Sequence, residues 1–255
     1  MIKVKLGVIS IFPQIFDSVL SYGITARAVE RNLLECHFFN PRDFTEDNYR
    51  TIDDRPFGGG PGMVMLYEPL AKAIVAAKKV LGEQTPVVYM SPQGKPLEHS
   101  IASEFAAISS LIILCGRYEG IDQRLIDGYV DYELSIGDYV LSGGELAAAV
   151  FIDATVRLIP GVLNHALSSK EDSFFDGLLD CPHYTRPRVL PSGTKVPDVL
   201  TGGNHADIKR WRDMMKLGLT FEKRPELIER RCLSEYEKTL LDEYKSNMNN
   251  KLDDK

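Results

Sequence analysis

The sequence of 255 residues lacks the features that direct a protein into a membrane or an oxidising compartment. It has no run of about 18 or more apolar residues, which a membrane-spanning helix needs. Residues 1–9 read as a strand, without the apolar core and small-residue cleavage site of a signal peptide. The four cysteines form no CxxC pair, which argues against a zinc ribbon and a disulfide framework. We therefore expect reduced thiols, a cytoplasmic location and no membrane partner.

Several catalytic signatures are also missing. The sequence has no GxxxxGK[ST] loop, no GxGxxG that follows a strand and opens a helix, and no GxSxG. These absences exclude Walker-type phosphate binding, the dinucleotide fingerprint and a serine-hydrolase elbow. The five histidines show no ligand spacing, so the sequence predicts no zinc or di-iron site.

The net charge of −6 is not typical of a non-specific nucleic-acid binder. The charge is unevenly distributed, because residues 183–231 carry 11 Lys or Arg against 6 Asp or Glu. On charge alone, an ordinary solvated helical face is the simpler explanation of this surplus.

Up to about residue 160, strand-like and helix-like segments alternate. The expected strands are short and apolar, at residues 5–10, 34–40, 87–90 and 111–115. The expected helices span residues 12–20, 25–32, 69–81 and 98–107. A further helix at 146–158 is apolar nearly all round, which suits a core or a subunit interface. The alternation predicts an α/β domain with helices packed on a mainly parallel sheet.

The composition changes after residue 163. Residues 164–176 are polar, residues 181–203 are rich in proline and glycine, and amphipathic helices follow to the end. We expect an α/β domain at 1–163, an interdomain linker at 164–175 and a small all-helical domain at 176–255.

Three loops follow candidate strands, at residues 89–94, 115–122 and 135–145. Ligands of open α/β sheets bind outside the carboxyl ends of the strands, so the three loops could form one cradle. Glycines let backbone groups approach a ligand closely, and such groups can read an adenine edge and a ribose. Each loop alone is better explained as a strand-to-helix turn, but three together favour a binding site.

A fourth loop, at residues 53–63, has four glycines and one proline in residues 58–62. This bias favours a loop that orders around a partner over a merely flexible connection.

Two charged residues are candidates for catalysis. Asp172 lies in the polar linker, where a carboxylate near a cleft could act as a general base, although a solvated acid is the simpler explanation. Arg157 lies in the apolar helix, where it could pair with Asp153 or stabilise negative charge that develops on a substrate.

Nine motifs in the same order resemble the bacterial tRNA (guanine-N1)-methyltransferase family of the SPOUT superfamily. They cover nearly the whole chain, which makes the series specific. They are residues 11–13 (IFP), 53–63 (DDRPFGGGPGM), 91–94 (SPQG), 114–122 (LCGRYEGID), 135–145 (SIGDYVLSGGE), 159–163 (IPGVL), 171–174 (EDSF), 181–187 (CPHYTRP) and 203–212 (GNHADIKRWR).

The resemblance implies an architecture and a cofactor. The family has a trefoil-knotted N-terminal domain, which departs from the rule that chains are unknotted. It binds S-adenosylmethionine in the knot loops and works as a homodimer with active sites at the subunit interface, while the helical domain helps hold tRNA. The implied cofactor-binding residues are Tyr89, Met90, Ser91, Pro92, Gln93, Gly116, Tyr118, Glu119, Ile136, Gly137, Asp138, Tyr139, Val140, Leu141, Gly143 and Gly144.

The resemblance also implies a reaction. The methyl group goes to N1 of the guanosine immediately 3′ of the anticodon (position 37), giving N1-methylguanosine, which supports reading-frame maintenance. Asp172 from the partner subunit would be the general base, Arg157 would stabilise charge on O6, and Glu119 would help balance the donor's sulfonium. A magnesium requirement follows from the resemblance, without a ligand that the sequence can place.

Two alternatives remain open. The target could be a ribose 2′-hydroxyl or another RNA base, although a general base at Asp172 argues against a plain ribose. The chain could instead be a non-enzymatic RNA-binding module, although the presence of Asp172, Arg157 and the three loops argues against that.

Overall fold

The computed structural model describes residues 3–163 and 171–253. The chain divides into two compact units, residues 1–166 and residues 167–255, and each is described by itself. Among the described residues, no helix is both long enough and apolar enough to span a bilayer.

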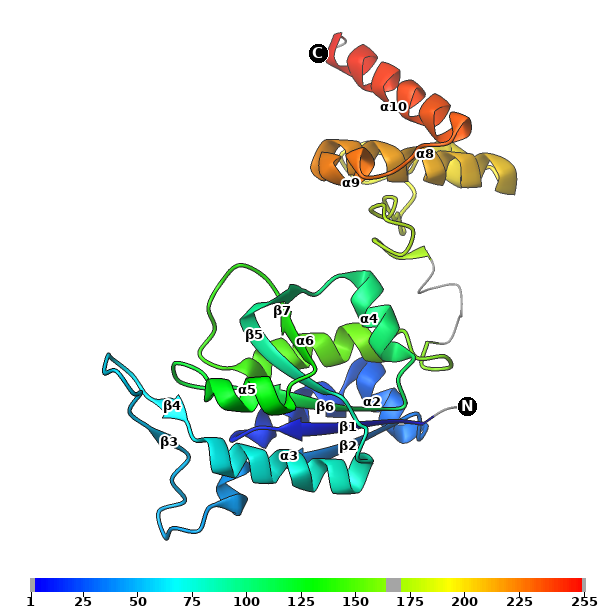
Figure 1. The fold of residues 1–255 in the computed structure, drawn as a ribbon. Helices are drawn as coiled ribbons and strands as arrows, with labels where there is room; N and C mark the ends of the chain where they lie inside the picture. The colour runs from blue at the N-terminus through cyan, green and yellow to red at the C-terminus, as the bar shows by residue number, and fades with distance from the viewer. Residues whose placement is uncertain (1–2, 164–170, 254–255) are drawn as a thin grey trace. The chain divides into compact units, whose positions relative to one another are not determined.

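Unit 1 is built on a five-stranded sheet with strand order β2-β1-β6-β5-β7, in which all paired strands run parallel (Figure 1). The predicted α/β class with a mainly parallel sheet is therefore confirmed. A separate antiparallel pair joins two short strands, β3 and β4. The strands are β1 (Val4–Ile9), β2 (Leu34–Phe39), β3 (Asp53–Asp54), β4 (Val64–Met65), β5 (Val87–Pro96), β6 (Ser110–Cys115) and β7 (Tyr132–Ser135).

Alternation along the central strands separates two cores, because successive side chains of a strand point to opposite faces. Val88 and Met90 of β5 belong to one apolar cluster, whereas Val87 and Tyr89 belong to the other. The first cluster includes residues of α2, α4 and α6, and the second includes residues of α3 and α5 (Figure 1). Helices cover both faces of the sheet, which explains why its central strands are apolar throughout.

Four of the five predicted helices lie within two residues of observed ones. The predicted helix at 12–20 is instead a short 3-10 helix followed by α1, which ends where Tyr22 adopts an extended conformation. Helix α5 was not predicted because only Leu125 of its seven residues is buried, which leaves little periodicity. The helices of unit 1 are η1 (Pro13–Phe16), α1 (Asp17–Ser21), α2 (Gly23–Glu30), η2 (Pro41–Phe44), α3 (Tyr67–Leu81), α4 (His99–Ala106), α5 (Gln123–Tyr129) and α6 (Gly144–Val156).

Unit 2 contains η3 (Asp198–Leu200), α8 (His205–Lys223), α9 (Pro225–Glu229) and α10 (Glu235–Asp253). Its small core joins α8 and α10 through Met214, Leu217, Leu240, Leu241 and Tyr244. The two helices approach closely at Gly218, where an added Cβ would lie 2.2 Å from Cδ2 of Tyr244. The boundaries predicted for the linker remain a prediction, and its residues 164–170 lie outside the described residues.

Candidate functional site

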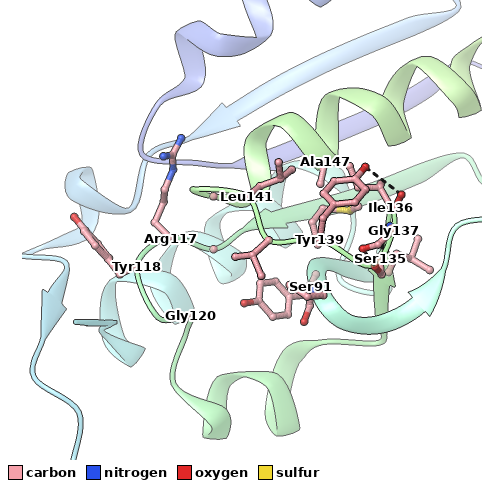
Figure 2. A pocket seen from close by; sticks show the side chains of 18 of the residues that line it. Ser91, Arg117, Tyr118, Gly120, Ser135, Ile136, Gly137, Tyr139, Leu141 and Ala147 are labelled. Atoms are coloured by element: carbon pink, nitrogen blue, oxygen red, sulfur yellow. Dashed lines mark hydrogen bonds between the residues drawn. The ribbon is translucent and has the colours of Figure 1, made fainter. Parts of the chain in front are cut away.

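A pocket lies at the carboxyl ends of β6 and β7 and beside residues 89–92 of β5, where the three predicted loops meet (Figure 2). Fourteen of the sixteen residues that the resemblance assigned to the cofactor line it. Gln93 and Asp138 do not line it, and both are exposed. The structure therefore brings together nearly all of the expected cradle, and whether these residues bind the cofactor remains a prediction. Five further lining residues were not assigned from the sequence: Arg117, Gly120, Leu134, Ser135 and Ala147.

The first loop is part of β5, which does not end at Met90 as predicted but continues to Pro96. The pairing with β7 shifts register between Met90 and Lys95, and the intervening residues bulge out of the strand. Gly94 lies so close to β7 that an added Cβ would be 2.4 Å from the backbone nitrogen of Leu134. Ser91 and Pro92 of this bulge line the pocket, whereas Gln93 is exposed and does not line it.

The second and third loops are joined by their backbones. The Gly144 N–H donates to the Gly116 carbonyl over 2.8 Å, and Arg117 forms a bridge with Gly143. Gly144 must be a glycine, because an added Cβ would lie 2.9 Å from Cα of Cys115. The glycines of these two loops therefore allow one loop to pack directly on the other.

A buried ion pair fixes the same junction. The Glu145 side chain is fully buried; its Oε1 accepts a hydrogen bond from the Ser10 hydroxyl at 2.8 Å, and its Oε2 accepts one from Nε of Arg117 at 2.8 Å. The Arg117 guanidinium also lies 4.8 Å from the ring centroid of Phe12. Burial, with a smaller contribution from the Glu145 carboxylate, raises the pKa of the Cys115 thiol well above its usual value. The network thus connects the end of β1, the loop after β6 and the start of α6.

Sequence reasoning missed this network, although a signal was present. Arg117 lies between two assigned residues of the second loop, and Glu145 is an acid at the start of a helix whose one other charged residue is Asp153. A charge in such a helix needs a partner, and Arg117 was the nearest cation in an adjoining loop.

The third loop folds back on itself (Figure 2). The Tyr139 hydroxyl donates to the Ile136 carbonyl at 3.3 Å, and the Tyr139 N–H donates to the Gly137 carbonyl at 2.9 Å. Gly137 has a φ of 149°, and an added Cβ would lie 2.5 Å from the Tyr139 ring. This turn leaves Asp138 exposed at its outer side.

Apolar and polar groups both line the pocket. Leu141, Ile136 and Ala147 offer apolar surface, while Ser91 and Ser135 offer hydroxyl groups. Burial raises the pKa of the Tyr89 hydroxyl to about 12, so this group stays protonated and can donate a hydrogen bond. In Figure 2 the side chains of Arg117 and Tyr118 point away from Ser91 and Tyr139.

The glycine-rich loop at residues 55–63 connects β3 to β4. Its carboxyl-terminal end is hydrogen-bonded to the second pocket loop, residues 115–122. The Glu119 N–H donates to the Met63 carbonyl at 2.9 Å, and the Met65 N–H donates to the Gly120 carbonyl at 2.9 Å. Gly62 packs against the Glu119 side chain, where an added Cβ would lie 2.4 Å from Oε1. Glu119 therefore lies between the pocket and this loop.

The two predicted catalytic residues belong to different units. Arg157 follows the last residue of α6 in unit 1, and its N–H donates to the Asp153 carbonyl at 3.3 Å. Asp172 belongs to unit 2 and is partly buried. Arg157 is not among the residues that line the pocket, and the roles of both residues remain predictions.

Comparison with known proteins gives a consistent family. Residues 4–230 match the model of the tRNA (guanine-1)-methyltransferase TrmD family. A tRNA (guanine-N(1)-)-methyltransferase of Pseudomonas fluorescens is 57% identical over 244 residues, which are 96% of this chain and 97% of the relative. An enzyme of the same name from Cronobacter sakazakii is 56% identical over 241 residues, which are 94% of this chain and 93% of the relative.

Proposed function

This chain belongs to the tRNA (guanine-1)-methyltransferase TrmD family, and we infer from that membership that it methylates N1 of a guanosine in tRNA. We propose that the target is position 37, immediately 3′ of the anticodon, and that the product, N1-methylguanosine, supports reading-frame maintenance. A tRNA substrate is consistent with a cytoplasmic location. The observation that carries the proposal is that residues 89–92 of β5 and the loops after β6 and β7 form one pocket.

The pocket fits S-adenosylmethionine by the chemistry of its lining. Ile136, Leu141 and Ala147 suit the faces of an adenine, and Ser91 and the buried Tyr89 hydroxyl can bond to a ribose or an amino acid group. The bound donor would supply a methyl group on a sulfonium, which is already a good leaving group. The protein's own contribution is to hold and orient donor and acceptor and to exclude water. Glu119, whose side chain reaches the neighbouring glycine-rich loop, would offset positive charge near the donor.

N1 of guanine carries a hydrogen, so methylation needs this proton removed. We propose that the Asp172 carboxylate takes the proton and that the Arg157 guanidinium stabilises the negative charge left on O6. Asp172 would come from the partner subunit of a homodimer. Support for an interface comes from α6, whose Leu146 and Val150 side chains are 54% and 49% exposed although the helix is otherwise largely buried.

A trefoil knot is supported by the topology of unit 1. The chain leaves β7 at the edge of the sheet and returns to pair with Gly116 and Arg117, beyond the end of β6. We further propose residues 1–163 as the catalytic domain, 164–175 as a linker and 176–255 as a tRNA-binding helical domain.

Magnesium finds little support in the residues present. Among the described residues, the one cluster of three potential metal ligands is Asp180, Cys181 and His183. A thiol and an imidazole are not the oxygen ligands that Mg²⁺ prefers. No step of the proposed reaction is therefore assigned to a metal.

The test uses methyl-labelled S-adenosylmethionine and a tRNA transcript with guanosines at positions 36 and 37. Label in N1-methylguanosine at position 37, lost when that guanosine is replaced by adenosine, is the expected result. Asp172→Asn should lower the rate about 10²–10⁴-fold while donor binding persists. Glu171→Gln removes a neighbouring exposed carboxylate and should change the rate little. Equal rates for the two variants would refute the role of Asp172, and donor binding without transfer to any guanosine would refute the substrate.

A further inference from the structure

Unit 2 has a pocket of its own whose lining includes three arginines, a histidine and a tyrosine but no acidic residue. It lies between the segment that follows Cys181 and one side of α8. The arginines are Arg186, Arg188 and Arg212. Such a concentration of positive charge in one hollow attracts anions, and its composition indicates which anion.

The pocket is formed by a defined backbone. The Val196 N–H donates to the Arg188 carbonyl at 2.9 Å, and Val189 and Lys195 form an antiparallel bridge, so residues 188–196 make a tight hairpin. Arg188 itself pairs with Asp198 at 3.0 Å. The opposite wall is α8, which begins at an Asn204 cap whose side chain accepts from the Ala206 N–H. The hairpin therefore fixes Arg188 and helix α8 fixes Arg212, while Arg186 lies two residues before the hairpin.

Two of the arginines are available for a ligand. Within the described residues, the side chains of Arg186 and Arg212 form no hydrogen bond or ion pair, and both residues are exposed. No existing ion pair has to be broken before they bind. The planar guanidinium matches phosphate oxygens in pairs, which makes arginine the preferred phosphate ligand of RNA-binding sites.

The aromatic residue distinguishes RNA from other anions. The Tyr184 side chain lines the pocket and is 49% exposed, and its ring lies 6.2 Å from that of Trp211. An aromatic ring held beside arginines offers a stacking surface for an unpaired base next to its phosphate. An acidic peptide would use the arginines but would gain little from the ring.

We propose that this pocket binds one unpaired nucleotide of the tRNA substrate, with its phosphate on Arg186 and Arg212 and its base on Tyr184. The inference rests on the proposed function, since it takes tRNA as the substrate. It adds a contact point, outside the donor pocket, that contributes to affinity for tRNA rather than to the chemistry of methyl transfer.

The experiment measures tRNA binding by the full-length protein at several salt concentrations. Arg186→Ala and Arg212→Ala are compared with Arg230→Ala, which removes an exposed arginine of unit 2 that does not line the pocket. Each pocket variant should raise the Kd for tRNA about tenfold, as expected for a lost charge-assisted bond. Each should also reduce the slope of log affinity against log salt, by at most about 0.7, the value for one whole phosphate contact of a single strand. The Arg230 variant should match the wild type.

Substitutions of Tyr184 provide an independent test of the proposed base stacking. Tyr184→Phe should bind like the wild type, whereas Tyr184→Leu should raise the Kd about tenfold without changing the salt slope, because stacking is lost and charge is not. The KM for tRNA should rise more than kcat falls, and the Kd for S-adenosylmethionine should stay constant. If the Arg186 and Arg212 variants behave like the Arg230 variant, the pocket is not an RNA site. If the wild type binds tRNA through this pocket but transfers no methyl group, the proposed function fails and the inference stands.

Discussion

The buried Glu145 carboxylate allows a sharp test of how the proposed donor pocket is held together. Glu145→Gln removes the charge at a fully buried position and leaves the Arg117 guanidinium, whose side chain is only 18% exposed, without its counter-ion. Loss of one partner from a buried pair costs about 3–5 kcal/mol, and the partial exposure of Arg117 places the expected loss near the lower end. The second and third loops should separate, so affinity for S-adenosylmethionine should fall as well.

The assay must report on unit 1. The protein has one tryptophan, Trp211, and it lies in unit 2, so its fluorescence does not follow the junction. Hydrogen exchange of the amides at residues 112–118 and 142–150 follows the junction directly. If these amides open together with unit 1, a loss of about 3 kcal/mol in its free energy of unfolding raises their exchange rate about 150-fold. The tryptophan transition should remain unchanged and serves as an internal control.

The control variant is Glu46→Gln, which breaks the exposed pair of Lys72 and Glu46 and should change the stability little, because solvent screens such a pair. The double variant Glu145→Gln with Arg117→Met should recover part of the loss, because no unpaired charge is left buried. If Glu145→Gln costs no more than Glu46→Gln, the ion pair does not hold the loops and the reasoning is refuted.

Further predictions concern backbone space, pH and thiol reactivity. Gly144→Ala should abolish donor binding, because its Cβ would collide with the backbone of β6. Gly128 lies in α5, where an added Cβ would meet no neighbouring element within 4 Å, so Gly128→Ala should stabilise unit 1 by up to about 1 kcal/mol. Calorimetry would compare the two variants. Burial raises the pKa values of Cys36 and Tyr89 to about 12, so the folded state holds these protons more tightly than the unfolded state. Stability from this source is complete below pH 9 and should decrease as the pH rises to 12, which urea unfolding followed by circular dichroism would detect; a flat profile would contradict it. The exposed Cys232 should react with iodoacetamide at pH 8 well before Cys36, as peptide mass mapping would show, and equal rates would count against the burial of Cys36.

The sequence determined the class of the fold and the membership of the pocket. Strands such as β6 are apolar at nearly every position, and only a parallel sheet covered on both faces makes that pattern favourable. Loops that follow parallel strands meet at one edge of the sheet, which predicted one site for the three loops, and the family resemblance named the fourteen residues that line the pocket.

Tertiary structure decided what local patterns do not encode. Strand β7 is half polar, and its position in the sheet is set by pairing with β5. The length of β5 depends in turn on the bulge at Gly94. The pairing of Glu145 with Arg117 and Ser10 spans 135 residues of sequence, and its stability comes from burial that exists only when β1, β6 and α6 are packed together. Local periodicity records which face of a segment is apolar, whereas the choice of partner depends on the whole chain, and the ion pair at the pocket is therefore a property of the folded protein.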